Sequence, residues 1–205
     1  MKVDTCHWKD KSFTEFMKYF LDLSGYNENI VEIGSDTQLK LALDLSGHCN
    51  TIYSVDFEHS NSYKRGWCEM HSKRGINNIK LIDGNVKNLS SLIKNADLIF
   101  TRRVVLEYEA GDMKKHMSYE RGEKELTKNE ISQLKDNFQR APKEVYEEFL
   151  RVANPGYLVL FNPADFETEN TIKSLGLEEN VVTVNLLAEP WKEVWPCVIV
   201  DNTNS

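Results

Sequence analysis

Short apolar runs alternate with amphipathic segments along most of the chain. Five runs are short, rich in β-branched or aromatic residues and flanked by glycine or polar residues, and they predict β-strands at residues 30–34, 51–56, 79–82, 96–100 and 157–161. Two further runs, at 181–187 and 194–200, are separated by a short link. That spacing predicts an antiparallel hairpin near the C-terminus.

The segment before the first strand, residues 1–25, predicts an amphipathic helix. Its apolar side chains recur at the spacing of one helix face: Phe13, Phe16, Met17, Phe20 and Leu21. Ser12 and Glu15 have the spacing of a capping box, and Gly25 is suited to end the helix. Such a helix either packs on the core or covers a ligand as a flap.

Amphipathic segments between the strands predict further helices. One carries Leu39, Ala42 and Leu43 on one face, with Asp36 or Thr37 as a candidate N-cap and Gly47 at its end. The others are a helix over 60–74 through Tyr63, Trp67 and Met70, a short helix through Leu89, Leu92 and Ile93, one that begins at Pro142, and one over 168–175.

Strands that alternate with helices indicate parallel strands joined by right-handed crossovers. We therefore predict an α/β fold. It is a doubly wound, mostly parallel seven-stranded sheet with helices on both faces and a C-terminal antiparallel hairpin. Residues 107–140 interrupt this order, because they are rich in charges of both signs and only weakly periodic. We interpret them as an inserted, largely helical segment after strand four, either a lid over the substrate or a solvated excursion.

Composition limits the class of protein. The 205 residues suit a single domain, and a net charge of −7 argues against a broad nucleic-acid surface. No apolar run is long enough for a membrane span, and the N-terminus shows no export signal. Four widely spaced cysteines predict a reduced, cytoplasmic setting. Cys68 and His71 form a lone C-x-x-H, which does not predict a metal site.

Several local signals occur in the order of one known family. They are Val31-Glu32-Ile33-Gly34-Ser35-Asp36 at the first strand, Asp56 ending the second, Gly84-Asn85-Val86 after the third, and Phe149 to Leu160 around Asn154-Pro155-Gly156. The chain resembles the class I S-adenosylmethionine-dependent methyltransferases over residues 26–200, outside the insertion. The resemblance implies S-adenosyl-L-methionine as cofactor, and cofactor-binding residues Glu32, Gly34, Ser35, Asp56, Phe57, Gly84, Asn85, Val86 and Thr101.

The chemistry of three of these positions fits that ligand. Gly34 allows the backbone to approach it closely, the Asp56 carboxylate can accept hydrogen bonds from both ribose hydroxyls, and the Asn85 amide can bond the adenine edge. By resemblance, Glu32 supports the methionine end. A dinucleotide is disfavoured, because G-x-G-x-x-G is absent and Asp36 would place a carboxylate beside a pyrophosphate.

The methyl acceptor is less defined, because an in-line methyl transfer depends on alignment and needs no fixed catalytic motif. Thr101-Arg102-Arg103 stands where amino-group methyltransferases carry an Asn/Asp-Pro-Pro-aromatic tetrapeptide. Candidates for contact with a small-molecule or protein substrate are Arg102 and Tyr108, with Arg103, Glu107 and His116 nearby. Trp191 and Trp195 either pack against the hairpin, line the acceptor site or form a homodimer contact. A non-catalytic binding or scaffold subunit is the alternative, since the first loop carries one glycine.

Overall fold

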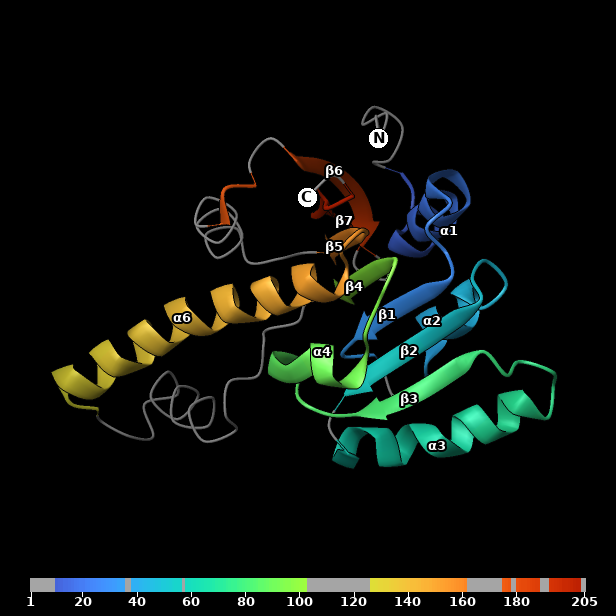
Figure 1. Ribbon diagram of the computed structural model, residues 1–205, viewed down its shortest axis with the longest axis horizontal. Helices are drawn as coiled ribbons and strands as arrows, with labels where there is room; N and C mark the ends of the chain where they lie inside the picture. The colour runs from blue at the N-terminus through green and yellow to red at the C-terminus, as the bar shows by residue number, and fades with distance from the viewer. Residues whose placement is uncertain are drawn as a thin grey trace.

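The computed structural model describes residues 10–35, 38–56, 58–102, 126–161, 175–177, 180–188 and 192–203. Figure 1 shows the arrangement of the helices and strands. In chain order they are α1 (Phe13–Ser24), β1 (Asn29–Ile33), α2 (Lys40–Leu45), β2 (Thr51–Asp56), α3 (Glu58–Ser72), β3 (Ile79–Asp83), the 3₁₀ helix η2 (Val86–Asn88), α4 (Leu89–Leu92), β4 (Leu98–Arg102), α6 (Lys128–Val152), β5 (Tyr157–Phe161), β6 (Val181–Ala188) and β7 (Glu193–Asp201).

The strands form one seven-stranded sheet in the order β3-β2-β1-β4-β5-β7-β6. Neighbouring strands from β3 to β5 run parallel, whereas β7 runs antiparallel to both β5 and β6. The predicted fold class and the C-terminal hairpin are therefore confirmed. The direction of strand progression reverses between β1 and β4, and ligands of open α/β sheets bind beyond the carboxyl ends of the strands at such a point.

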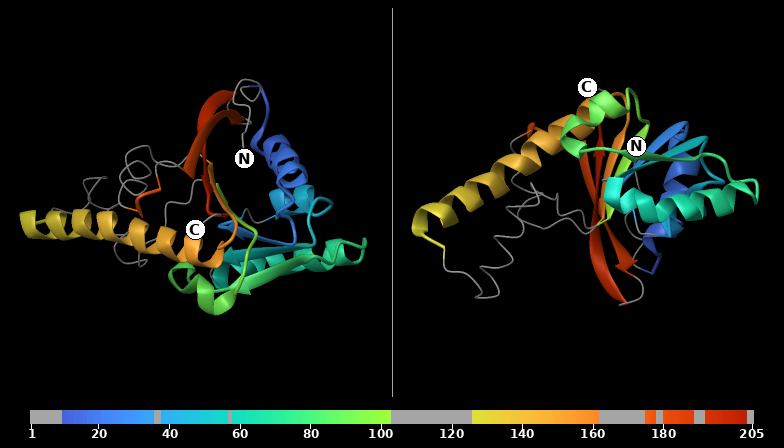
Figure 2. Two further views of the ribbon diagram at one scale, coloured as in Figure 1. Left: turned by 45° about the horizontal axis from the view of Figure 1, so that its top comes forward. Right: turned by 90° about the horizontal axis from the view of Figure 1, so that it is seen from below.

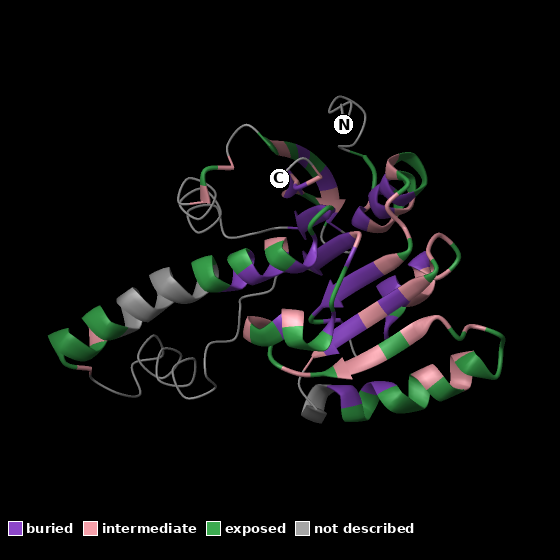
Figure 3. Ribbon diagram, viewed as in Figure 1, coloured by how far each residue is buried: buried purple, intermediate pink, exposed green. Residues whose placement is uncertain are grey.

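Alternate residues of the strands feed two separate cores, one on each face of the sheet. Ile30, Ile52 and Leu98 join a cluster with the buried faces of α1 and α2. Val31 and Ile99 join the opposite cluster, which includes α4 and the C-terminal part of α6. Figures 2 and 3 show helices on both faces and a buried sheet between them. Because both faces are covered at the centre of the sheet, a central strand can be apolar on both sides, as in β5, where every residue is buried.

The N-terminal helix α1 forms as predicted. The Ser12 side chain accepts a hydrogen bond from the Glu15 backbone N–H, and the Ser12 N–H donates to the Glu15 carboxylate at 2.8 Å, so the capping box is present. Gly25 ends the helix in the left-handed conformation, at φ 69°. All five residues of the apolar stripe are buried, and Phe13 stacks on Phe161 at 4.5 Å between ring centroids. The helix thus packs on the core.

Helix α6 differs from the prediction, which placed a helix start at Pro142. The helix is continuous over Lys128–Val152, and a capping box between Thr127 and Glu130 begins it. Residues 128–140 of the predicted insertion are therefore helical and lead directly into the buried face near β5. The start was missed because residues 126–133 are exposed or half-buried and so carry little apolar periodicity. In Figure 1 this end of α6 extends away from the sheet. Residues 107–125 of the insertion lie outside the described residues.

Smaller differences concern element ends. Helix α2 begins at Lys40 with Leu39 in the N-cap position at φ 55°, and the candidate caps Asp36 and Thr37 lie outside the described residues. Strand β4 covers Leu98–Arg102 instead of 96–100. Asp97 lies in the segment before the strand, where its carboxylate accepts hydrogen bonds from the N–H groups of Glu28 and Asn29 at 2.7 and 2.9 Å.

Helix α3 buries a different face from the aromatic one that marked it in the sequence. Tyr63 and Trp67 are 61% and 36% exposed, whereas Asn61 and Lys64 are fully buried. A polar face of this helix therefore lies against the sheet. No helix among the described residues is both long and apolar enough to cross a membrane.

Candidate functional site

The carboxyl ends of β1, β2 and β3 bring predicted site residues together. The Gly34 N–H donates to Val55 O at 3.2 Å, and the Gly84 N–H donates to Asp56 O at 3.0 Å. Thr101 on β4 is the register partner of Ile33 on β1. Backbone contacts alone therefore place Gly34, Asp56 and Gly84 beside one another at the edge where the sheet reverses its order.

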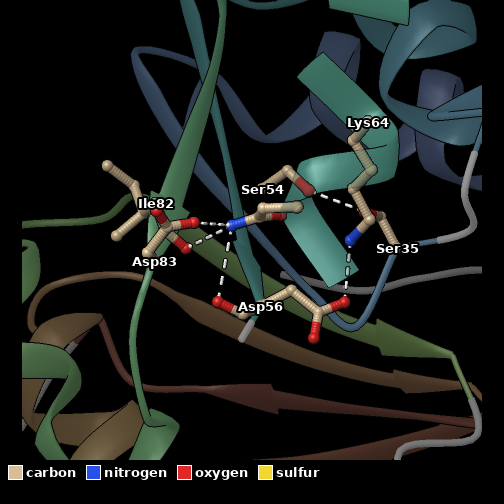
Figure 4. Close-up of polar contacts among 7 residues, drawn as sticks. Ser35, Ser54, Asp56, Lys64, Ile82 and Asp83 are labelled. Carbon is tan, nitrogen blue, oxygen red and sulfur yellow. Dashed lines mark hydrogen bonds and ion pairs between the residues drawn. The ribbon is translucent and has the colours of Figure 1, made fainter. Parts of the chain in front are cut away.

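The turn after β1 is held by its own polar contacts. Gly34 adopts φ 67°, in the left-handed region where a side chain would be strained. The hydroxyl of Ser35 lies 2.6 Å from that of Ser54, and both side chains are buried (Figure 4). This bond ties the turn to β2. The predicted role of Gly34, a close approach of the backbone to a ligand, is compatible with this conformation.

Two predicted residues lie in the sheet itself, just before this edge. Glu32 is 2% exposed and Thr101 is 6% exposed. Burial of a carboxyl group is costly, because desolvation disfavours its charged form.

Asp56 is engaged by a side chain that the sequence analysis did not single out. The Lys64 ammonium donates to Asp56 Oδ2 at 2.7 Å (Figure 4), and the exposed fractions of the two side chains are 0% and 16%. The lysine reaches the end of β2 from the next helix, α3. Asp56 thus remains partly accessible at the edge of the sheet, but with a buried cation against one of its oxygens.

Asn61, one turn before Lys64, fastens α3 to two strand ends. Its amide donates to Asp56 O at 3.4 Å, to Ile82 O at 3.0 Å and to Asp83 Oδ1 at 2.6 Å. Asp83 also accepts from Arg65 at 3.0 Å. The sequence analysis missed Asn61 and Lys64 because the aromatic residues of α3 indicated its other face, and it missed Asp83 because the predicted third strand ended at residue 82. The available signal was the three-residue spacing of Asn61 and Lys64, which places both on one face.

The segment after β3 carries three predicted cofactor contacts, Gly84, Asn85 and Val86. The Asn85 side-chain oxygen accepts from the Lys87 N–H at 2.9 Å and caps η2, so this oxygen already has a local partner. Asn85 is exposed and Val86 half-buried. A Cβ on Gly84 would lie 2.3 Å from Leu92 Cδ1, so the glycine makes room for that side chain.

The remaining predicted residues are tested only in part. Phe57 and Tyr108 lie outside the described residues, as do Arg103, Glu107, His116 and Trp191. Arg102 ends β4 opposite Phe161, and its side chain lies outside the description. Trp195 is half-buried, with its ring 5.8 Å from that of Phe161, as the packing alternative predicts. Within the described ranges, no three His, Cys, Asp or Glu side chains gather in a way that could hold a metal ion.

Comparison with known proteins adds evidence for the fold. No family profile matches the chain, and no curated protein is similar to it in sequence. Solved structures are similar. The N-methyltransferase NodS from Bradyrhizobium japonicum WM9 is 17% identical, with 93% of this chain and 94% of that chain covered and a TM-score of 0.56. A putative S-adenosyl-L-methionine-dependent methyltransferase from Methanococcus maripaludis is 14% identical, with 94% and 86% covered and a TM-score of 0.59.

A third structure contains a ligand. The putative methyltransferase SMU.1697c from Streptococcus mutans, in complex with S-adenosyl-L-homocysteine, is 13% identical, with 91% of this chain and 96% of that chain covered and a TM-score of 0.51. These similarities extend over nearly the whole chain. The chain therefore has the class I methyltransferase fold that its sequence resembles, and the low identities leave its chemistry to be argued from the site.

Proposed function

We propose that this protein catalyses S-adenosyl-L-methionine-dependent methyl transfer to a small-molecule or protein acceptor. The observation that carries the proposal is the position of the Asp56 carboxylate, which is partly accessible at the end of β2, beside the left-handed turn at Gly34. This is the edge at which the sheet reverses its order, where α/β folds bind ligands.

The residues at this edge fit the proposed cofactor chemically. Asp56 would bind the ribose hydroxyls, since a carboxylate accepts two hydrogen bonds at once. The buried Glu32, near the end of β1, would support the methionine end of the cofactor, and Thr101 lies on the adjacent strand. Asn85 and its neighbours Gly84 and Val86 would contact the adenine side. Ser35 and Phe57, which flank the ends of β1 and β2, complete the proposed set.

The chain's own contribution to such a reaction is alignment. The bound cofactor supplies an electrophilic methyl group, and the protein holds the acceptor in line with it and excludes water. The candidates for binding a polar or acidic acceptor are Arg102 at the end of β4 and Tyr108 further along the chain. A cytoplasmic location, a single domain over residues 1–205 and a homodimer remain predictions.

Isothermal titration calorimetry with S-adenosyl-L-homocysteine tests the proposal. We expect micromolar binding to the wild-type protein and at least about tenfold weaker binding to Asp56→Ala, because a hydrogen bond to a charged group contributes about 1.5–3 kcal/mol. Asp22→Ala is the matched control. It removes an exposed carboxylate on α1 that pairs with His48, and we expect unchanged affinity.

One observation favours the alternative, a non-catalytic binding or scaffold subunit with the methyltransferase fold. The carboxylate that should meet the ribose is already paired with a buried lysine. If the wild-type protein produces no heat of binding with millimolar S-adenosyl-L-homocysteine while it remains folded, the enzyme proposal is refuted and this alternative is favoured.

A further inference from the structure

Two carboxylates stand side by side where β2 and β3 end. Asp56 and Asp83 are register partners on these parallel strands. Adjacent like charges repel, and the repulsion is strong where water is partly excluded. Consecutive residues of α3 supply the compensating cations: Lys64 lies 2.7 Å from Asp56 Oδ2, and Arg65 lies 3.0 Å from Asp83 Oδ2.

The two ion pairs differ in burial. The exposed fractions are 0% for Lys64 and 16% for Asp56, but 54% for Arg65 and 41% for Asp83. An exposed pair contributes little, because water screens it and both side chains can move. A buried ammonium must keep a partner, since removal from water is costly for an unpaired charge. The position of Lys64 is therefore much more constrained than that of Arg65.

The helix that carries Lys64 is itself fixed against the strand ends. Asn61 donates to the backbone oxygens of Asp56 and Ile82 and to the side chain of Asp83. Figure 4 shows the bond from Lys64 to Asp56 at the end of β2, with Ile82 and Asp83 beside it at the end of β3. The lysine therefore has a defined direction of approach to the carboxylate.

We propose that Lys64 is the positioning residue of the ligand site: it fixes the orientation of the Asp56 carboxylate at the carboxyl edge of the sheet and thereby sets the affinity for the ribose. The inference rests on the proposed function. A carboxylate has about four acceptor directions, so one side chain can accept from an ammonium and from ribose hydroxyls at once. In this proposal Lys64 acts on the ligand only through Asp56.

A double-mutant cycle on affinity for S-adenosyl-L-homocysteine tests this. Lys64→Met keeps most of the buried side-chain volume and removes the charge, and we expect it to weaken binding about tenfold. In an Asp56→Asn background the same substitution should change the affinity less than about twofold, because the group through which Lys64 acts is already altered. If Lys64 acted only by stabilising the fold, Lys64→Met would weaken binding equally in the wild-type and Asp56→Asn proteins.

Arg65→Met is the matched control, since it removes a cation from the next position of the same helix. We expect binding within about twofold of the wild type. Lys64→Gln, which retains an N–H donor, should bind with intermediate affinity, and it replaces the methionine variant in the cycle if circular dichroism shows that variant to be unfolded.

The outcomes separate the two proposals. Absence of binding to the folded wild-type protein overturns both. If the wild type binds but Lys64→Met binds equally well, or weakens binding equally in both backgrounds, only the role of Lys64 is overturned.

Discussion

Gly156 permits a close approach between two backbone segments. A Cβ at this position would lie 2.7 Å from Asp97 O and 2.8 Å from Ala96 O. The turn before β5 is bound to the same segment, because Tyr157 N–H donates to Asp97 O at 2.9 Å and Ala96 N–H donates to Val152 O at 3.0 Å. The neighbours are thus backbone atoms held on both sides, and they cannot rotate away as a side chain would.

Gly156→Ala should therefore destabilise the fold markedly. A carbon–oxygen contact needs about 3.3 Å, so the backbones must separate by roughly 0.5 Å. Overpacking of a filled interior costs about 1–3 kcal/mol, and a strained backbone hydrogen bond adds about 1 kcal/mol. We expect a loss of about 3 kcal/mol in the free energy of unfolding. At about 2–4 °C per kcal/mol for a chain of this size, the melting temperature should fall by roughly 6–12 °C.

Equilibrium unfolding in urea, followed by circular dichroism, measures this loss directly. Gly66→Ala is the matched control. It lies within α3, and a Cβ there would meet nothing within 4 Å. Since alanine favours a helix over glycine, we expect a gain of about 0.5–1 kcal/mol. A loss below about 1 kcal/mol for Gly156→Ala, or an equal loss for Gly66→Ala, would refute the packing argument.

This prediction also bears on the resemblance to methyltransferases. The segment Asn154-Pro155-Gly156 was the most recognisable part of the sequence, yet Gly156 contacts the link before β4 and lies at the amino end of β5. Proposed ligand contacts lie at the opposite ends of the strands. The motif therefore indicates how the fold packs, and it gives no information about catalysis.

Two further predictions concern stability. Asn202→Ala should lower the free energy of unfolding by about 2 kcal/mol. The buried side-chain amide donates hydrogen bonds to Leu150 O at 2.9 Å and Ala153 O at 2.8 Å, two backbone oxygens at the end of α6. An unchanged melting temperature would contradict this role. Burial raises the pKa of the Cys49 thiol to about 12 and raises that of Cys197 further in the same direction. Because the folded state retains these protons while the unfolded chain releases them, stability should be full below about pH 9 and fall as the pH rises toward 12. Urea unfolding at pH 8 and pH 10.5 measures the change, and Cys197→Ser should reduce it.

Local patterns in the sequence were sufficient for the fold class. The central strands are short apolar runs whose side chains are buried on both faces, and the alternation of strands with helices admits few topologies. The ends of α1 could be predicted equally well, since the capping box at Ser12 and the glycine at Gly25 act through neighbouring residues. The capping box at Thr127 was equally local, but the exposed start of α6 lacks the apolar stripe that would have drawn attention to it.

Only the tertiary structure decided how the polar residues at the sheet edge are paired. Nothing in the spacing of Asp56 and Lys64 indicates an ion pair, because it depends on how α3 lies across the ends of β2 and β3. In the same way, the backbone against which Gly156 packs lies far away in the chain. In α1 hydrophobic periodicity determines which face is buried. The buried polar face of α3 and the partner of its buried charge are determined by the packing of elements that are distant in sequence.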